Sequence, residues 1–228
     1  MLMSFPALRP LRPDWTMPER PSGLGLSPSL DPLTHRFAVW AGRQGGTCAD
    51  IGCGGGIATA AALVRGARVV AIDPDTSNIE PLLDQLPVQL RARVRVSCGR
   101  LPTLHFDPAS LTAIHAARVL HLLEGDEIRQ SLQQFRHWLR QDGKLFFSVL
   151  TPDGSQWAAF HPEYARRCAK NEVWPGAADS RRPHLLDQHV LQRELTRAGF
   201  TVAELLEFPL AWDATQMCCG IVATPLVR

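Results

Sequence analysis

The sequence has no long apolar run, which excludes a membrane-spanning segment. None of its hydrophobic stretches approaches the roughly 18 residues of a transmembrane helix. Its beginning, MLMSFPALRPLRPDWTMPERP, lacks the apolar core and small-residue cleavage site of a secretory signal peptide. We therefore expect a cytoplasmic protein without a membrane partner.

A strong charge of one sign is also lacking. The 228 residues carry a formal net charge of +2, and the isoelectric point is near 8.3. Charge this mild does not predict nucleic-acid binding. Because 45% of the residues are hydrophobic, the chain can build a sizeable core in one large domain or two small ones.

Cysteine pairs of the C-x-x-C type are absent. The spacing argues against a zinc site and against a disulfide framework, so we expect no metal and six small buried thiols. These are Cys48, Cys53, Cys98, Cys168, Cys218 and Cys219.

Proline concentrates in residues 1–33, and such a segment resists helix and central strand. We interpret it as an extended or partly disordered arm. It either folds over the site, with Trp15 as a lid residue beside Phe37 and Trp40, or has no role. Residues 34–228 form the predicted domain, with a cap inserted at about 151–185.

Apolar periodicity predicts strands that alternate with helices. The predicted strands are 47–53, 68–73, 93–99, 111–120, 144–150, 201–208 and 217–226, and the predicted helices are 33–40, 57–66, 77–86, 125–143 and 186–200. This alternation indicates an α/β, doubly wound, mostly parallel sheet with helices on both faces. The last two strands have no helix between them and predict a hairpin.

Glycines follow the first predicted strand in the pattern acid-x-G-x-G-x-G, formed by Asp50, Gly52, Gly54 and Gly56. Glycine lets the main chain turn sharply and approach a ligand. The dinucleotide fingerprint G-x-G-x-x-G fails, because its third glycine would fall at Ile57 or Thr59. This disfavours a nicotinamide oxidoreductase.

Two carboxylates flank this loop. Asp50 would repel a diphosphate but could hold an ammonium group, directly or through water. Asp73 ends the next strand, where a carboxylate suits the two hydroxyls of a ribose. A ligand with an amino-acid end, a ribose and no diphosphate fits both, and S-adenosylmethionine (SAM) has these parts.

At these residues the sequence resembles the class I SAM-dependent methyltransferases. ADIGCGGG is similar to their first motif, VVAIDPD to their second-strand acid motif, and ARVLHLL and WLRQDGKLFFSV to later segments. The resemblance spans roughly residues 35–226. It implies a Rossmann-like seven-stranded sheet of order 3-2-1-4-5-7-6 with strand 7 antiparallel, and a cofactor site formed by Asp50, Gly52, Cys53, Gly54, Gly56, Asp73 and Pro74.

One position departs from that family. Many members carry an aspartate for the adenine amino group after strand three, where this chain has Arg100. Arginine cannot accept that hydrogen bond. Either the backbone near Gly99–Leu101 reads the adenine, which places Gly99, Arg100 and Leu101 at the site, or Arg100 is a surface residue.

Methyl transfer needs positioning, exclusion of water and sometimes a base. His121 follows the fourth predicted strand and is either a general base or a packing residue, whereas we expect His115, inside that strand, to be structural. In the predicted cap, His161 and Tyr164 are the polar side chains expected to touch the acceptor. The other aromatic residues of the cap either cover the acceptor or are only core: Trp157, Phe160 and Trp174. Its arginines would attract an anionic acceptor or form a solvated face: Arg166, Arg167, Arg181 and Arg182.

The function predicted is methyl transfer from SAM to a small-molecule acceptor by direct in-line displacement. A protein or peptide methyltransferase shares the fold and stays open, as does a SAM-binding module without turnover. A nucleic-acid methyltransferase is disfavoured, since AARVLHLL stands where base-modifying members carry Asn/Asp-Pro-Pro-aromatic.

Overall fold

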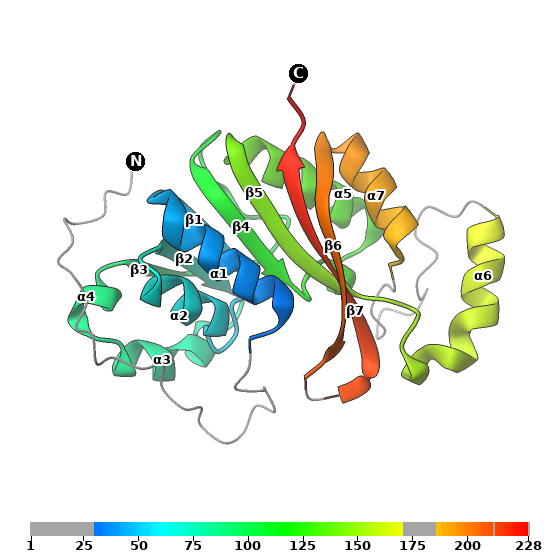
Figure 1. The fold of residues 1–228 in the computed structure, drawn as a ribbon, viewed down its shortest axis with the longest axis horizontal. Coiled ribbons are helices and arrows are strands. Elements are labelled where there is room, and N and C mark those ends of the chain that lie inside the picture. The colour runs from blue at the N-terminus through cyan, green and yellow to red at the C-terminus, as the bar shows by residue number, and fades with distance from the viewer. Residues whose placement is uncertain (1–29, 171–185, 212, 228) are drawn as a thin grey trace.

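The computed structural model describes residues 30–170, 186–211 and 213–227. Its seven strands form one sheet in the order β3-β2-β1-β4-β5-β7-β6, and β7 runs antiparallel to both of its neighbours (Figure 1). The strand order and the final hairpin are therefore confirmed. The strands are β1 (Thr47–Ile51), β2 (Arg68–Asp73), β3 (Val94–Cys98), β4 (Leu111–Ala117), β5 (Leu139–Leu150), β6 (Phe200–Leu210) and β7 (Asp213–Pro225).

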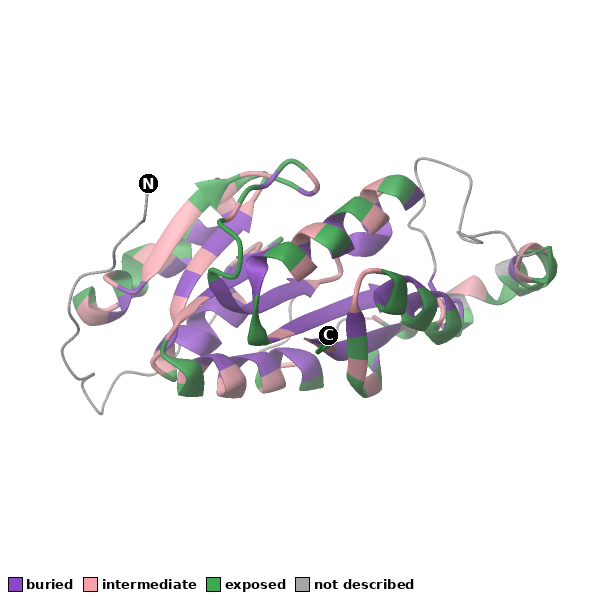
Figure 2. Cartoon of the chain, turned by 90° about the horizontal axis from the view of Figure 1, so that it is seen from above, coloured by how far each residue is buried: buried purple, intermediate pink, exposed green. Residues whose placement is uncertain are grey.

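Helices cover both faces of the sheet. One face packs against α1 (Pro32–Gln44), α2 (Ile57–Val64), α3 (Glu80–Gln85) and α4 (Val88–Arg91); the other packs against α5 (Gly125–Trp138) and α7 (Gln188–Arg197). Side chains alternate between the two cores along each strand, so Phe146 enters the first and Phe147 the second. Figure 2 shows buried strands between helices whose outer sides are exposed.

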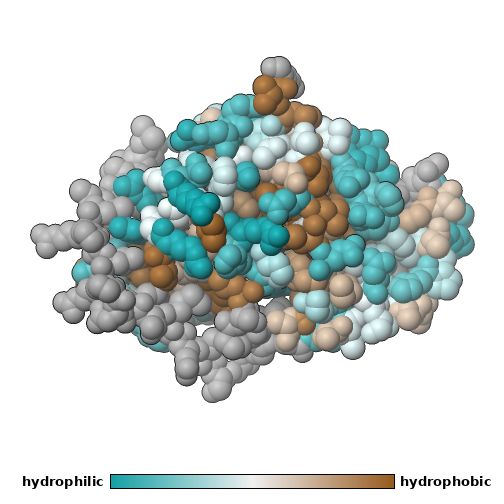
Figure 3. Space-filling view, in the orientation of Figure 1, coloured by the Kyte–Doolittle hydropathy of each residue, from teal (hydrophilic) through white to brown (hydrophobic). Residues whose placement is uncertain are grey.

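Short helices join these elements. They are the 3-10 turns η1 (Thr76–Ile79), η2 (Leu120–Leu122) and η3 (Ser155–Phe160), followed by α6 (His161–Ala169). In the part of the chain that the structure describes, no helix is both long and apolar enough to cross a bilayer. Hydrophilic side chains cover much of the face on which α1 lies (Figure 3).

Helix α1 begins where the sequence places a capping residue. Asp31 is the N-cap, its Oδ1 accepts the Thr34 N–H at 2.9 Å, and Pro32 occupies the first turn. Gly45 ends the helix with φ of 67°. Leu33 and Phe37 are fully buried against the sheet. Asp31 thus belongs to the folded domain, although its sequence composition assigned it to the arm.

The boundary predicted at Gly143 is wrong. Helix α5 ends at Trp138, and Leu139 is extended, buried and paired with Leu111 of β4. The strand register shifts before Ala113 pairs with Lys144, so 140–143 form an irregularity within β5 rather than a last helical turn. The helix predicted at 77–86 divides into η1 and α3, and α6 was foreseen only as part of a cap.

The prediction of six buried thiols holds in part. Cys48, Cys218 and Cys219 are buried, whereas Cys98 on the edge strand β3 is exposed. Neighbours Cys218 and Cys219 enter opposite cores of the sheet, as the alternation of a strand requires.

Helices α5 and α7 are joined by a buried carboxylate. Glu194 is 3% exposed and receives Arg129 of α5 at 3.0 Å, Arg193 at 3.1 Å and Arg197 at 2.9 Å. Burial alone would raise the pKa of Glu194. The hydrogen bonds from Arg129 and Arg193 and the charges of Arg129 and Arg197 outweigh burial, so the pKa lies below its usual range.

We expect Glu194→Gln to lower the free energy of unfolding at pH 7 by about 2 kcal/mol, since the arginines lose a charged partner. A lowered folded-state pKa adds stability above the unfolded-state pKa of about 4.3, and this stability is lost as pH falls through the folded value. Urea denaturation at pH 7 and pH 4 should therefore show a smaller pH dependence in the variant. Glu163→Gln, at an exposed ion pair, is the control. Equal effects of both substitutions would contradict this account.

Candidate functional site

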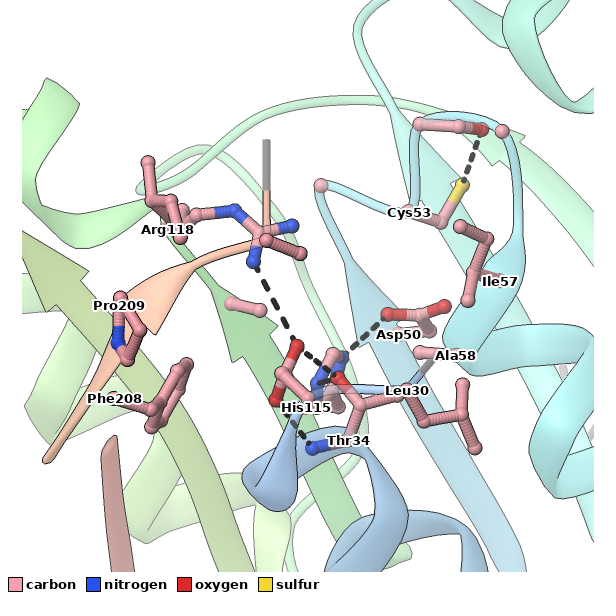
Figure 4. A pocket seen from close by; sticks show the side chains of 17 residues that line it. Leu30, Thr34, Asp50, Cys53, Ile57, Ala58, His115, Arg118, Phe208 and Pro209 are labelled. Carbon is pink, nitrogen blue, oxygen red and sulfur yellow. Dashed lines mark hydrogen bonds and ion pairs between the residues drawn. The ribbon is translucent and has the colours of Figure 1, made fainter. Parts of the chain in front are cut away.

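A cavity of about 310 Å³ lies at the carboxyl ends of β1 and β4. Four segments form its walls: the start of α1, the loop from β1 to α2, the end of β4 and the end of β6. In Figure 4, Phe208 and Pro209 stand on one side of the cavity, and Cys53 and Ile57 stand on the other. The carboxyl edge of a parallel sheet is the usual place for ligands in open α/β folds.

The loop after β1 requires glycine for two different reasons. At Gly52, with φ of 70°, an added Cβ would lie 2.4 Å from Val119 Cγ2. At Gly54, with φ of 48°, an added Cβ would meet no protein atom within 4 Å, although the residue lines the cavity. Glycine at position 52 allows packing, whereas glycine at position 54 leaves bare backbone facing the cavity.

Asp73, at the end of β2, joins this loop to the next strand. Its Oδ2 accepts the Gly54 N–H at 2.9 Å, and its Oδ1 accepts the Asp75 N–H at 3.0 Å. Each carboxylate oxygen has a second lone pair. The side chain is partly exposed, so it can still accept hydrogen bonds from ribose hydroxyls.

The residues predicted near adenine follow β3. The Gly99 N–H donates to the Asp73 carbonyl at 3.1 Å, and Leu101 is buried. The Arg100 side chain is 68% exposed and lies 3.8 Å from Glu127 of α5. Arg100 therefore points toward α5, and the Gly99 backbone stays beside Asp73 and Pro74.

Asp50 is the most enclosed acid at the cavity. It is 1% exposed, its Oδ2 accepts the Thr59 hydroxyl at 2.6 Å, and its Oδ1 lies 2.8 Å from His115 Nδ1. His115 is buried, stacks on Phe37 at 4.7 Å between ring centroids, and contacts the Thr34 hydroxyl through Nε2 at 3.3 Å (Figure 4). The histidine expected to be structural thus lies in the cavity wall, bonded to the acid of the first motif.

Hydrogen bonds continue from Thr34 to the cavity mouth. The Thr34 hydroxyl donates to Asp31 Oδ2 at 2.9 Å, and Arg118 Nη1 lies 3.7 Å from the same oxygen. Arg118 directly follows β4 and adopts a positive φ of 58°. Asp31, Thr34 and Arg118 were absent from the predicted site. The Asp-Pro helix start and the position of Arg118 after a strand were the available signals.

The three side chains predicted for catalysis lie away from this cavity. His121 is buried in η2, where its Nδ1 accepts the Leu150 N–H at 3.4 Å. His161 is exposed at the start of α6 and contacts the Pro152 carbonyl oxygen. Tyr164 is buried, donates its hydroxyl to Asp187 at 2.8 Å and so links α6 to α7. Burial, reinforced by Asp187, raises the pKa of Tyr164. The catalytic roles of these residues stay predictions.

The structure describes only some of the other residues predicted for the cap and the arm. Arg167 pairs with Glu163 at 3.2 Å and Arg166 pairs with it at 3.8 Å, so both face an acid of their own helix. Trp15, Trp174, Arg181 and Arg182 lie outside the described residues.

Cys53 lines the cavity, and burial, with Asp50 and Asp73 nearby, raises the pKa of its thiol. A raised pKa keeps this thiol protonated and a poor nucleophile at neutral pH.

Comparison with known proteins decides the family. A family model described as a methyltransferase domain matches residues 26–205, which is most of the chain. The protein belongs to this methyltransferase family. It is a SAM-dependent methyltransferase of class I, with S-adenosylmethionine as its cofactor. No curated protein matches the chain.

Solved structures share the fold of this methyltransferase. The Burkholderia thailandensis 1,6-didemethyltoxoflavin-N1-methyltransferase, solved with S-adenosylhomocysteine, is 21% identical, with a TM-score of 0.64, covering 86% of this chain and 79% of its own. A Methanosarcina mazei SAM-dependent methyltransferase is 17% identical, with a TM-score of 0.66 and coverage of 87% and 99%. A glycopeptide N-methyltransferase complexed with SAM is 18% identical, with a TM-score of 0.62 and coverage of 85% and 87%.

The residues of this methyltransferase fit the cofactor. Gly54 leaves the approach to the loop open, and Asp73 retains lone pairs for ribose hydroxyls. Asp50 also lines the cavity, but it is 1% exposed and each of its oxygens already has a protein partner, Thr59 or His115. These bonds join β1 to α2 and β4, and the ammonium contact expected for Asp50 stays a prediction.

We expect Gly54→Ala to weaken binding of S-adenosylhomocysteine by at least about tenfold, because a methyl group would enter the cavity and displace the ligand from the loop. Gly45→Ala is a matched control, since Gly45 also has a positive φ of 67° and no atom within 4 Å of an added Cβ. Both variants should lose about 1 kcal/mol of stability from backbone strain. Isothermal titration calorimetry measures the affinity, and unchanged binding by Gly54→Ala would contradict the assignment of the loop.

Proposed function

We propose that the protein transfers the methyl group of S-adenosylmethionine to a small-molecule acceptor. The cavity carries this proposal: its volume of about 310 Å³ lies at the lower end of the range for small-molecule sites, so beside the methyl-donating end of the cofactor it leaves room only for a compact acceptor group. The end of β6 faces the glycine loop across the cavity, and the start of α1 closes it from below in the view of Figure 4. A space bounded in this way suits a compact acceptor better than a folded protein surface.

S-adenosylmethionine supplies a methyl group that its sulfonium charge has already activated. The chain then has to hold the reacting groups in line and keep water away. Leu30, Phe208 and Leu210 give the cavity apolar walls that would exclude water around the acceptor. Positioning and desolvation support the proposal, and we assign no general base to the reaction.

A peptide acceptor is the second candidate. The glycopeptide N-methyltransferase among the similar structures supports it, because the same scaffold there serves a peptide-based substrate according to its name. A flexible chain could insert one side chain or terminus into the cavity. A SAM-binding protein without turnover is the third alternative, and it would show cofactor binding without any methyl transfer.

Thermal unfolding tests cofactor use first. S-adenosylmethionine or S-adenosylhomocysteine at about 100 times its dissociation constant should add roughly 2.7 kcal/mol to the stability of the folded state. NAD should add nothing. Asp73→Asn should reduce the shift, because the ribose loses a charged hydrogen-bond partner, while one acceptor oxygen remains for the loop. A shift with NAD alone would refute the proposal.

Transfer of a radiolabelled methyl group identifies the acceptor class. The protein is incubated with labelled S-adenosylmethionine and an extract of the host cell, which is then passed through a filter that retains peptides and proteins. Label in the filtrate that chromatography separates from S-adenosylmethionine, in excess of that formed by the Asp73→Asn variant, supports a small-molecule acceptor. Label confined to the retained fraction supports the peptide alternative, and no transfer to either fraction contradicts turnover.

A further inference from the structure

The cavity contains a carboxylate and a guanidinium, Asp31 and Arg118, on the β4 side of the glycine loop. We propose that Asp31 binds the α-ammonium group of the cofactor's methionine end and that Arg118 binds its α-carboxylate. In this proposal Thr34, His115 and Asp50 hold Asp31 in place. The inference rests on the same cofactor site as the proposed function, and it assigns residues that the sequence did not identify.

The location of the cavity supports this assignment. Asp73, the last residue of β2, and Gly99, the first residue after β3, suit the nucleoside and do not line the cavity. The glycine loop borders the cavity, which continues past β1 to Arg118 at the end of β4. A ligand whose ribose lies at Asp73 and which crosses Gly54 therefore reaches the cavity with its other end, the amino acid.

Accessibility distinguishes the two acids near that end. The Asp50 side chain is 2% exposed, and Thr59 and His115 occupy its oxygens. The Asp31 side chain is 20% exposed and lines the cavity. An ammonium group entering the cavity therefore meets the more exposed carboxylate of Asp31, whereas Asp50 lines the cavity with an almost fully enclosed side chain.

The charges at the mouth match those of an amino acid. Arg118 Nη1 and Asp31 Oδ2 are 3.7 Å apart, which is too long for a hydrogen bond, and both side chains are partly exposed. Such a pair contributes little stability. An α-amino acid carries an ammonium and a carboxylate on the same carbon, so it can place each charge against the opposite one. The planar guanidinium can donate two parallel hydrogen bonds to a carboxylate.

Asp31 and Arg118 are both held in defined positions at the cavity. Arg118 adopts φ of 58°, a strained conformation for a residue other than glycine, and such strain concentrates at ligand sites. Asp31 receives the Thr34 N–H and the Thr34 hydroxyl, both at 2.9 Å. Thr34 in turn contacts His115, which bonds to Asp50. The buried Asp50 thus helps to hold Asp31, the more exposed acid at the start of α1, in place.

Calorimetry with two ligands tests the proposal. S-adenosylhomocysteine carries the amino-acid end, whereas 5′-methylthioadenosine has the same nucleoside without it. Asp31→Asn keeps the N-cap, because asparagine caps as well as aspartate, but it removes the charge. We expect Asp31→Asn and Arg118→Gln to weaken binding of S-adenosylhomocysteine by about tenfold to a hundredfold. Binding of 5′-methylthioadenosine should not change.

The chain offers a matched control in Arg140 and Asp142, an exposed ion pair of the same two residue types on β5 outside the cavity. Arg140→Gln and Asp142→Asn should bind both ligands like the wild type. Equal losses for both ligands in the Asp31 and Arg118 variants, or no loss, would overturn the proposal. Arg118→Lys, which keeps the charge, replaces Arg118→Gln if that variant does not fold. Failure of the wild type to bind either ligand would instead refute the cofactor site itself.

Discussion

The buried carboxylate of Asp50 is the constraint on which the site depends. A charge that is 1% exposed costs several kcal/mol of desolvation unless hydrogen bonds replace water, and here Thr59 and His115 provide them. Thr59 belongs to α2 and His115 to β4, so satisfying this one charge joins β1 to elements on either side. The contact of His115 with Thr34 adds α1 to the same network.

The network also determines which groups remain for a ligand. Asp50 and His115 bond to each other and are almost fully buried, whereas the Asp31 and Arg118 side chains in the same cavity lining are 20% and 28% exposed. In our proposal, stability depends on Asp50 and cofactor binding on Asp31, two acids joined by one chain of hydrogen bonds. The acceptor would then lie among the apolar residues of α1 and β6, and its identity depends on side chains that the shared fold does not specify.

Much of this arrangement can be predicted from the sequence, because it depends on residues that are close together in the chain. The glycine pattern and Asp73 predict a strand, a turn and a ribose partner, and the family resemblance supplies the strand order. Leu139 was assigned to a helix because its spacing continues that of Phe135, but pairing with β4 overrides the helical period. The positions of His115 and Asp31 in the cavity wall were not predicted, because they depend on partners 65 and three residues away, which periodicity does not reveal.

A crystal structure with S-adenosylhomocysteine tests the central claim most directly, which is that the cavity between β1, β4 and α1 receives the amino-acid end of the cofactor. The account predicts ribose hydroxyls on Asp73, the sulfur beside the glycine loop, and the ammonium and carboxylate groups on Asp31 and Arg118. A ligand whose amino-acid end lies outside this cavity, or directly on an Asp50 that has released His115, would contradict it.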